Sequence, residues 1–172
     1  MASNEIYKLI LLGESNVGKT SIVSVFIKGV FLPDVKSTDG ASYMSKKITL
    51  PDNNTINLDI WDISGQKKYR ALTKFFFKDA KGVILVYDPT REESFEELKE
   101  YWYQEIKDLN LALAVVANKS DLDEKEVKDE DGKKFAESIG AIFASVSAKD
   151  NIGITSLFER IAQNIGLKGE WI

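Results

Sequence analysis

Residues 13–20 read Gly-Glu-Ser-Asn-Val-Gly-Lys-Thr, follow an apolar run at residues 6–12 and open an amphipathic segment. This order predicts a buried strand, a glycine-rich turn and a helix. Such a turn directs consecutive backbone N–H groups and the positive end of the helix dipole at one point, where an anion is stabilised. Lys19 can reach the outer phosphates of a nucleotide, and the Thr20 hydroxyl can bind a magnesium ion. The alternative is a strand, turn and helix with incidental glycines, but the setting favours a nucleotide site.

Composition limits the chemistry that is open to this chain of 172 residues. It has no cysteine and no histidine, which excludes disulfides, thiolate metal sites and a histidine general base. Any metal should therefore be a hard cation on oxygen ligands, which suits magnesium. A net charge of −4 gives no broad attraction to nucleic acid. The apolar stretches are far shorter than the ~20 residues of a membrane span, no signal peptide opens the chain, and the length predicts one domain over residues 1–172.

Apolar runs alternate with amphipathic or charged segments along the whole chain. The runs predict strands at residues 6–12, 41–50, 55–61, 82–87, 113–117 and 141–145. The segments between them predict helices at residues 20–28, 91–109, 129–139 and 153–165. The turn-prone residues 51–54 join two strands as a hairpin, and residues 29–40 form a loop. This order predicts an α/β fold with a six-stranded, mostly parallel sheet, one antiparallel edge strand and helices on both faces.

Polar motifs follow three of the predicted strands, at residues 62–66, 118–121 and 147–149. Ligands of such sheets bind beyond the carboxyl ends of the strands. The Asp121 carboxylate can accept hydrogen bonds from two adjacent donors of guanine, N1–H and the N2 amino group. Adenine has no such pair and would leave a buried carboxylate unpaired, at a cost of ~1–3 kcal/mol or more. Residues 118–121 alone are also compatible with a surface turn, but their place behind a phosphate loop favours a guanine site.

The neighbours of Asp121 can complete a base site. Asn118 can support the base edge and its loop, and the aliphatic stem of Lys119 can cover one face of the ring. The backbone N–H of Ala148 can donate to the guanine carbonyl oxygen.

These motifs, in this order, resemble the Ras-like small GTPases, and the similarity covers residues 6–166. Segments similar to Rab GTPases lie at residues 37–43, 58–62, 68–72, 76–80 and 85–88. Residues 13–15 and 40–41 resemble the endosomal Rab branch. The resemblance implies a P-loop NTPase fold, binding of GTP or GDP with Mg²⁺, slow GTP hydrolysis, and a switch that regulates vesicle and membrane trafficking through effectors.

The resemblance also implies a role for each switch residue. Thr38 lies nineteen residues past Lys19, and there it would complete the magnesium shell and contact the γ-phosphate only when GTP is bound. Asp62 would hold magnesium through a water, and the Gly65 N–H would bind the γ-phosphate. Loss of that phosphate would relax both loops. Phe31 would lie against the guanine; the alternative is an apolar anchor for its loop.

Gln66 is the residue type that the family uses to orient the attacking water, although a lone glutamine is also compatible with a solvated loop. Residues 29–40 contain no arginine, so we expect no arginine finger in cis. Intrinsic turnover on the order of 10⁻⁴–10⁻³ s⁻¹ is expected, with acceleration by a partner that donates arginine. The predicted catalytic residues are Gln66, Lys19 and Thr38, and the predicted metal ligands are Thr20, Thr38 and Asp62. The predicted nucleotide-binding residues are Ser15, Asn16, Val17, Gly18, Lys19, Thr20, Ser21, Phe31, Thr38, Gly65, Asn118, Lys119, Asp121, Ser147, Ala148 and Lys149.

The implied partners are a GTPase-activating protein, an exchange factor and effectors, which would bind the two switches and the aromatic trio Tyr43, Trp61 and Phe76. Ordinary strand packing is the alternative for the trio. We expect no nucleic-acid partner, and we expect the protein to be a monomer. Departures from the family pattern at Asp39, Ile63, Ser64, Lys67 and Pro89 remove no phosphate or magnesium ligand.

The implied location is cytoplasmic, on the cytosolic face of endosomal or other transport membranes. Rab proteins normally end in a tail with prenylated cysteines, whereas residues 168–172 contain no cysteine, and Ala2 excludes N-myristoylation. Either a lipidated tail is missing from this sequence, which we favour, or the protein reaches membranes only through partners.

Two rival classes stay open at this point. One is a P-loop kinase or ATPase, which the guanine-reading Asp121 and the chain length disfavour. The other is a nucleotide-held scaffold that does not hydrolyse GTP, which Gln66 and Thr38 disfavour.

Overall fold

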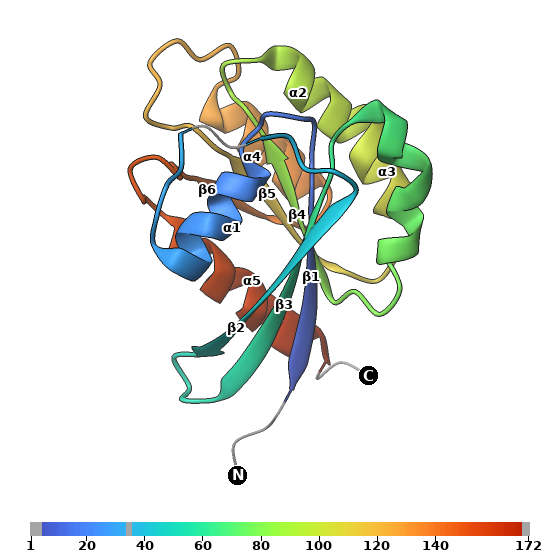
Figure 1. Cartoon of the computed structure of the whole chain (residues 1–172), viewed down its shortest axis with the longest axis vertical. Coiled ribbons are helices and arrows are strands. Elements are labelled where there is room, and N and C mark those ends of the chain that lie inside the picture. Colours follow the sequence, from blue (N-terminus) through green and yellow to red (C-terminus); the bar gives the residue numbers. More distant parts are fainter. Residues whose placement is uncertain (1–4, 34–35, 170–172) are drawn as a thin grey trace.

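The computed structural model describes residues 5–33 and 36–169 of the chain. Within them, six strands form one sheet in the order β2-β3-β1-β4-β5-β6 (Figure 1). They are β1 (Ile6–Leu12), β2 (Ala41–Thr49), β3 (Thr55–Ile63), β4 (Gly82–Tyr87), β5 (Ala112–Ala117) and β6 (Ile142–Ser145). All neighbours run parallel except the edge pair β2 and β3. The predicted sheet is confirmed, with strand bounds that differ by no more than two residues.

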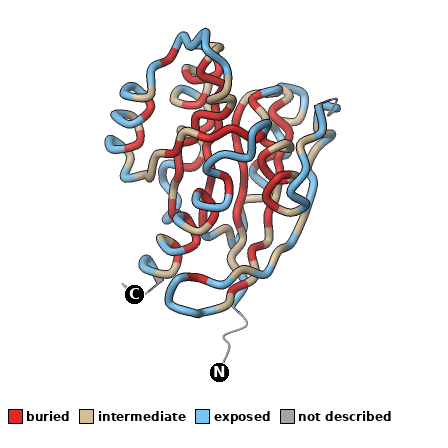
Figure 2. The backbone as a smooth tube through the Cα atoms, turned by 90° about the vertical axis from the view of Figure 1, so that its left-hand side faces the viewer, coloured by how far each residue is buried: buried red, intermediate tan, exposed pale blue. Residues whose placement is uncertain are grey.

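Helices cover both faces of this sheet (Figure 1). On one face α1 (Lys19–Lys28) and α5 (Ile154–Gly169) share a core in which the rings of Phe26 and Phe158 stack at 3.9 Å. The other face carries α2 (Glu92–Glu97), the π-helix η2 (Leu98–Trp102), α3 (Tyr103–Ile106) and α4 (Asp129–Ser138). Figure 2 shows buried backbone through the centre and exposed turns at the outer sides of the helices.

The burial of each strand explains its sequence pattern. Every residue of the central strand β4 is buried, as expected for a strand covered on both faces, and its sequence is a continuous apolar run. The edge strand β2 has no buried residue and alternates between half-buried and exposed positions along most of its length. The sheet edge beside β2 therefore lies close to solvent.

Two helical features differ from the prediction. Residues 91–109 were predicted as a helical segment, and residues 92–106 are helical, but with the π-helical turn η2 and its fully buried Trp102 in the middle. Residues 67–76 were assigned no structure, and they form a 3₁₀ helix, η1 (Lys67–Phe76). Its repeat of three residues does not match the 3.6-residue period of an α-helix, and only Thr73 in it is buried.

The structure does not test the expectations about lipidation at the ends of the chain. Ala2 and residues 170–172, on which expectations about lipidation were based, lie outside the described residues. No helix in the described ranges is both long enough and apolar enough to cross a bilayer.

Candidate nucleotide-binding site

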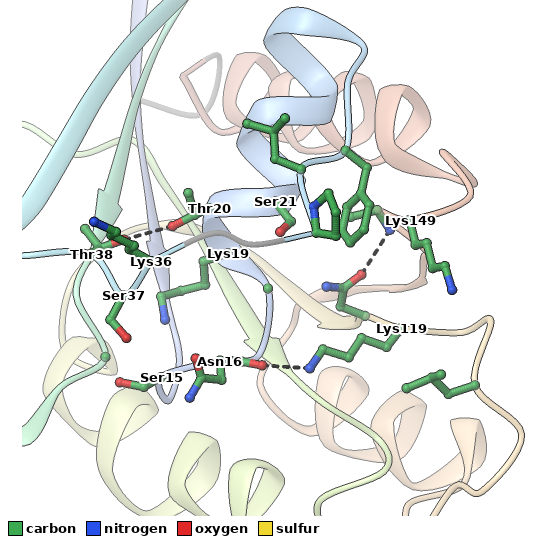
Figure 3. Close-up of a pocket in the computed structure, with 18 of the residues that line it drawn as sticks. Ser15, Asn16, Lys19, Thr20, Ser21, Lys36, Ser37, Thr38, Lys119 and Lys149 are labelled. Atoms are coloured by element: carbon green, nitrogen blue, oxygen red, sulfur yellow. Dashed lines mark hydrogen bonds between the residues drawn. The ribbon is translucent and has the colours of Figure 1, made fainter.

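A cavity of about 320 Å³ opens where the loops after the parallel strands meet (Figure 3). Most of the predicted nucleotide-binding residues line it, and Val17 and Ser147 lie fully buried behind its wall. Six further lining residues in the described ranges were not identified from the sequence: Leu32, Pro33, Lys36, Ser37, Ser64 and Leu122. Among the described residues, Asp62 and Gln66 are predicted site residues that contact the wall rather than line it, as the contacts below show.

The phosphate loop joins β1 to α1 and holds Lys19 at its centre. The Lys19 ammonium donates to the carbonyl oxygens of Gly13 at 2.8 Å and Glu14 at 2.9 Å. Burial lowers the pKa of Lys19 to about 8, although the nearby carboxylates of Asp62 and Glu14 act in the opposite direction. Because burial disfavours an unpaired ammonium, this site gains most from an anionic ligand.

Glycine is required in this loop by conformation and by space. Gly18 has φ +98°, and a Cβ there would clash with the side-chain amide of Asn118. A Cβ on Gly13 would clash with the carbonyl oxygen of Val86. The two glycines let the loop lie directly against the neighbouring strands.

Three oxygen-bearing side chains converge beside Lys19. The hydroxyls of Thr20 and Thr38 lie 2.8 Å apart (Figure 3), and each also hydrogen-bonds Oδ2 of Asp62, Thr38 at 3.2 Å. Oδ1 of Asp62 is buried and has no hydrogen-bond partner among the described residues. Burial raises the pKa of Asp62, against hydrogen bonds from Thr20 and Thr38 and the charge of Lys19.

This oxygen cluster fits a magnesium ion. A hard cation takes hydroxyl and carboxylate oxygens, and it would compensate the buried charge that Asp62 otherwise carries with one oxygen unsatisfied. In the described part of the chain, no three Asp, Glu, His or Cys side chains gather as a metal site. The oxygen cluster beside Lys19 consists instead of two threonine hydroxyls and one carboxylate.

The two predicted switch segments, the first around Thr38 (residues 36–40) and the second from Ser64 through η1 (residues 64–76), are joined directly by hydrogen bonds. The Gln66 side-chain amide donates to the carbonyl oxygen of Thr38 at 3.1 Å, and the Ser64 N–H donates to Gly40 at 2.8 Å. A Cβ on Gly65 would clash with backbone atoms of the phosphate loop, so this segment lies in contact with that loop. The structure thus brings Gln66, Thr38 and the phosphate loop together.

The residues predicted to bind the base form a connected network. The Asn118 amide donates to the carbonyl oxygen of Val17 at 3.0 Å and accepts from the N–H of Ala148 at 3.2 Å. The Ser147 hydroxyl donates to Oδ1 of Asp121 at 2.8 Å. The Ala148 N–H, which was predicted to reach the guanine, thus has Asn118 as its partner here. Ser147 orients Asp121, a role that its sequence position alone did not indicate.

Lys119 is held across the cavity from two sides. Its ammonium donates to the carbonyl oxygen of Asn16 at 2.8 Å (Figure 3) and pairs with the buried Asp88 at 3.0 Å. Burial alone would raise the pKa of Asp88, but hydrogen bonds from Thr90 and Lys119 lower it below the ordinary value. Lys119 therefore links the predicted base-binding motif to the predicted phosphate loop.

The predicted aromatic residues are placed as follows. Phe31 lines the cavity and also packs against the core on the α1 side, so both interpretations of this residue have support. The ring centre of Trp61 lies 5.0 Å from that of Tyr43 and 5.5 Å from that of Phe76, and half of the Tyr43 surface is exposed. The trio is therefore one contiguous cluster that reaches the surface.

Comparisons with known proteins identify sequences similar to this chain. A model of the Ras family matches residues 8–167. The chain is 41% identical over 169 residues to Ras-related protein Rab-22A of Homo sapiens, covering 96% of this chain and 86% of that protein. It is 40% identical over 170 residues to Ras-related protein Rab-31 of Mus musculus, with 96% and 85% covered. Ras-related protein Rab-5B of Plasmodium falciparum is 40% identical over 161 residues, with 92% and 77% covered.

Proposed function

The chain belongs to the Ras family, and from this membership we propose how its residues divide the work of a Rab-type switch. As a small GTPase of this type it binds GTP and GDP with Mg²⁺, hydrolyses GTP to GDP and phosphate, and acts as a molecular switch in membrane trafficking. It works with activating proteins, exchange factors and effectors. What we propose is the role of each residue, the surface that partners bind and the membrane concerned.

In the proposed site, Lys19 and the N–H groups of the phosphate loop bind the phosphates, and the Asp121 carboxylate binds the guanine. Thr20, Thr38 and Asp62 would hold Mg²⁺, which when bound offsets charge on the β- and γ-phosphates. The unpartnered Oδ1 of Asp62 beside two hydroxyls supports this assignment.

Gln66 is proposed to orient the attacking water together with the carbonyl oxygen of Thr38. The single observation that carries the proposal is the 3.1 Å hydrogen bond between these groups, because it places the amide beside the proposed metal ligands. Hydrolysis of this kind depends on positioning and electrostatics rather than on a general base with a shifted pKa. An arginine from an activating protein would add a guanidinium charge, since residues 29–40 contain no arginine.

The γ-phosphate is proposed to control partner binding. Contacts of Thr38 and Gly65 with this phosphate would hold both switch segments in the joined arrangement described above, and their loss would release the segments. While the γ-phosphate is present, effectors would bind the two switches and the cluster of Tyr43, Trp61 and Phe76, and the protein would act as a monomer. The endosomal Rab-like residues 13–15 and 40–41 support action on the cytosolic face of endosomal membranes.

Partner capture tests this proposal. The protein loaded with a non-hydrolysable GTP analogue should retain a set of proteins from a cell extract that GDP-loaded protein does not retain, because only the first joins its switches. Quantitative mass spectrometry of the two eluates measures the difference. Tyr43→Ala should reduce the retained set, whereas Tyr103→Ala, whose ring packs against Phe135 of α4 and not against the aromatic trio, should not. Identical eluates from the two nucleotide states would contradict the proposal.

A further inference from the structure

Residues 67–81 have a charge opposite to that of the rest of the chain. They include six basic residues and one acidic residue, a net charge of +5 inside a chain whose total is −4. The remainder therefore carries −9. This segment begins directly after Gln66 and includes the 3₁₀ helix η1.

One side of η1 anchors it to the body of the protein. In a 3₁₀ helix residues three apart share a side, and Arg70, Thr73 and Phe76 are three apart. Thr73 is buried, Phe76 contacts Trp61, and Arg70 pairs with Glu97 at 2.6 Å. The Arg70 guanidinium also lies 3.9 Å from the ring centre of Tyr101.

The other two sides of η1 face outward. Leu72 and Phe75 are again three apart, and 47% and 77% of their surfaces are exposed. Lys68 and Lys74 share the neighbouring side and are exposed, as is Lys78 just beyond the helix. We call these five residues the basic apolar face. An aromatic side chain this exposed, flanked by cations, is typical of a binding surface rather than of a solvated helix side.

We infer that the basic apolar face docks an acidic segment of a partner protein, in which apolar side chains cover Phe75 and Leu72 while carboxylates pair with the lysines. Charge complementarity carries the choice of partner, because a positive strip in an acidic protein attracts carboxylates and repels cationic segments. A bulky aromatic anchor beside it supplies the apolar contact that charge alone lacks.

The surroundings favour a narrow protein segment over an anionic membrane. The acidic helical segment 92–106 lies directly beside η1, as the Arg70–Glu97 pair and the 3.7 Å Lys74–Glu105 pair show. A planar anionic surface laid on the lysines would also approach those carboxylates. A single peptide segment can follow the basic apolar face and avoid those carboxylates.

Docking should depend on the bound nucleotide. The Tyr69 hydroxyl donates to Asp39 at 3.3 Å, and the Gln66 amide donates to the carbonyl oxygen of Thr38. Residues at the start of η1 are therefore hydrogen-bonded to the first switch segment. The docking face lies on the second switch segment, so the inference rests on the proposed function and deepens it by naming the chemistry of the partner that binds there.

A fluorescein-labelled synthetic helical peptide of glutamate and leucine tests the inference by fluorescence anisotropy. The protein loaded with a GTP analogue should bind it, and added salt should weaken binding because salt screens exposed charges. The triple variant Lys68→Glu, Lys74→Glu, Lys78→Glu should lose about tenfold or more in affinity, and Phe75→Ser about threefold or more. All variants should bind fluorescent GDP as the unaltered protein does, which controls for folding.

The matched control is Lys125→Glu, Lys133→Glu, Lys134→Glu, which makes the same charge change at exposed lysines elsewhere. It should change peptide affinity by no more than about twofold. An equal loss in both triple variants, no binding of the peptide by the unaltered protein, or tight binding to phosphatidylserine vesicles in its place would overturn the inference. Equal peptide binding with GDP and with the GTP analogue, with the variant effects intact, would support the docking face and contradict the nucleotide dependence.

Discussion

Asp121→Asn should lower the affinity for GDP and GTP by on the order of 100-fold and make xanthosine diphosphate the preferred ligand. The carboxylate accepts from N1–H and the N2 amino group of guanine, and each hydrogen bond to a charged group contributes ~1.5–3 kcal/mol. An asparagine amide presents a donor where guanine also presents a donor. Xanthine has a carbonyl in place of the amino group, so it can accept from that amide.

Competition between labelled GDP and unlabelled guanine or xanthine nucleotides measures the relative affinities for the two bases. Asp123→Asn is the matched control. It makes the same chemical change at an exposed aspartate two residues away. It should leave the affinities unchanged. If Asp121→Asn and Asp123→Asn showed the same preference for guanine, Asp121 would not be the residue that reads the base.

Gln66→Leu should slow single-turnover GTP hydrolysis about tenfold or more while leaving GTP affinity unchanged. Leucine can neither donate to the Thr38 carbonyl oxygen nor orient a water, and a loss of positioning alone costs a factor of this size or larger. The affinity for GTP should persist because Lys19 and Asp121 line the cavity, whereas the Gln66 side chain does not. Phosphate release after mixing preloaded protein with Mg²⁺ measures the rate.

Gln104→Leu provides the comparison for this variant. Gln104 is exposed on α3, and its side-chain amide donates to the carbonyl oxygen of Lys99 at 3.2 Å. Its rate should equal that of the unaltered protein. An unchanged rate in Gln66→Leu would remove Gln66 from the mechanism and would revive the alternative of a nucleotide-held scaffold.

The sequence predicted the sheet and the phosphate loop because both depend on local patterns. The run at residues 6–12 and the glycines that follow it fix a strand, a turn and a helix within one stretch of chain. The motifs after β3, β5 and β6 were predicted to meet because parallel strands end at the same sheet edge. The structure brings these motifs around one cavity.

Contacts between distant segments could not be predicted in the same way. The Gln66–Thr38 and Lys119–Asp88 contacts join residues from different loops, and only the folded chain sets their distances. The 3₁₀ period of η1 has no strong sequence signature. Its outward lysines and phenylalanine were therefore not recognised as one face.

Two departures from the family pattern gain a physical interpretation. Asp39 accepts a hydrogen bond from Tyr69 and so adds a link between the two switch segments. Ser64 is buried, and its hydroxyl accepts from the backbone N–H of Gln66 at 3.2 Å. Nothing in the structure explains Pro89 beyond its backbone carbonyl, which accepts from residues 126 and 127.

Hydrogen–deuterium exchange at the backbone amides of residues 36–40 and 64–76 tests the central claim most directly. The claim is that the terminal phosphate joins these two segments. With Mg²⁺ and a non-hydrolysable GTP analogue, both segments should exchange more slowly than with Mg²⁺ and GDP, while β4 and β5 remain unchanged. Equal exchange of both segments in the two nucleotide states, with the nucleotide bound in each, would contradict the account.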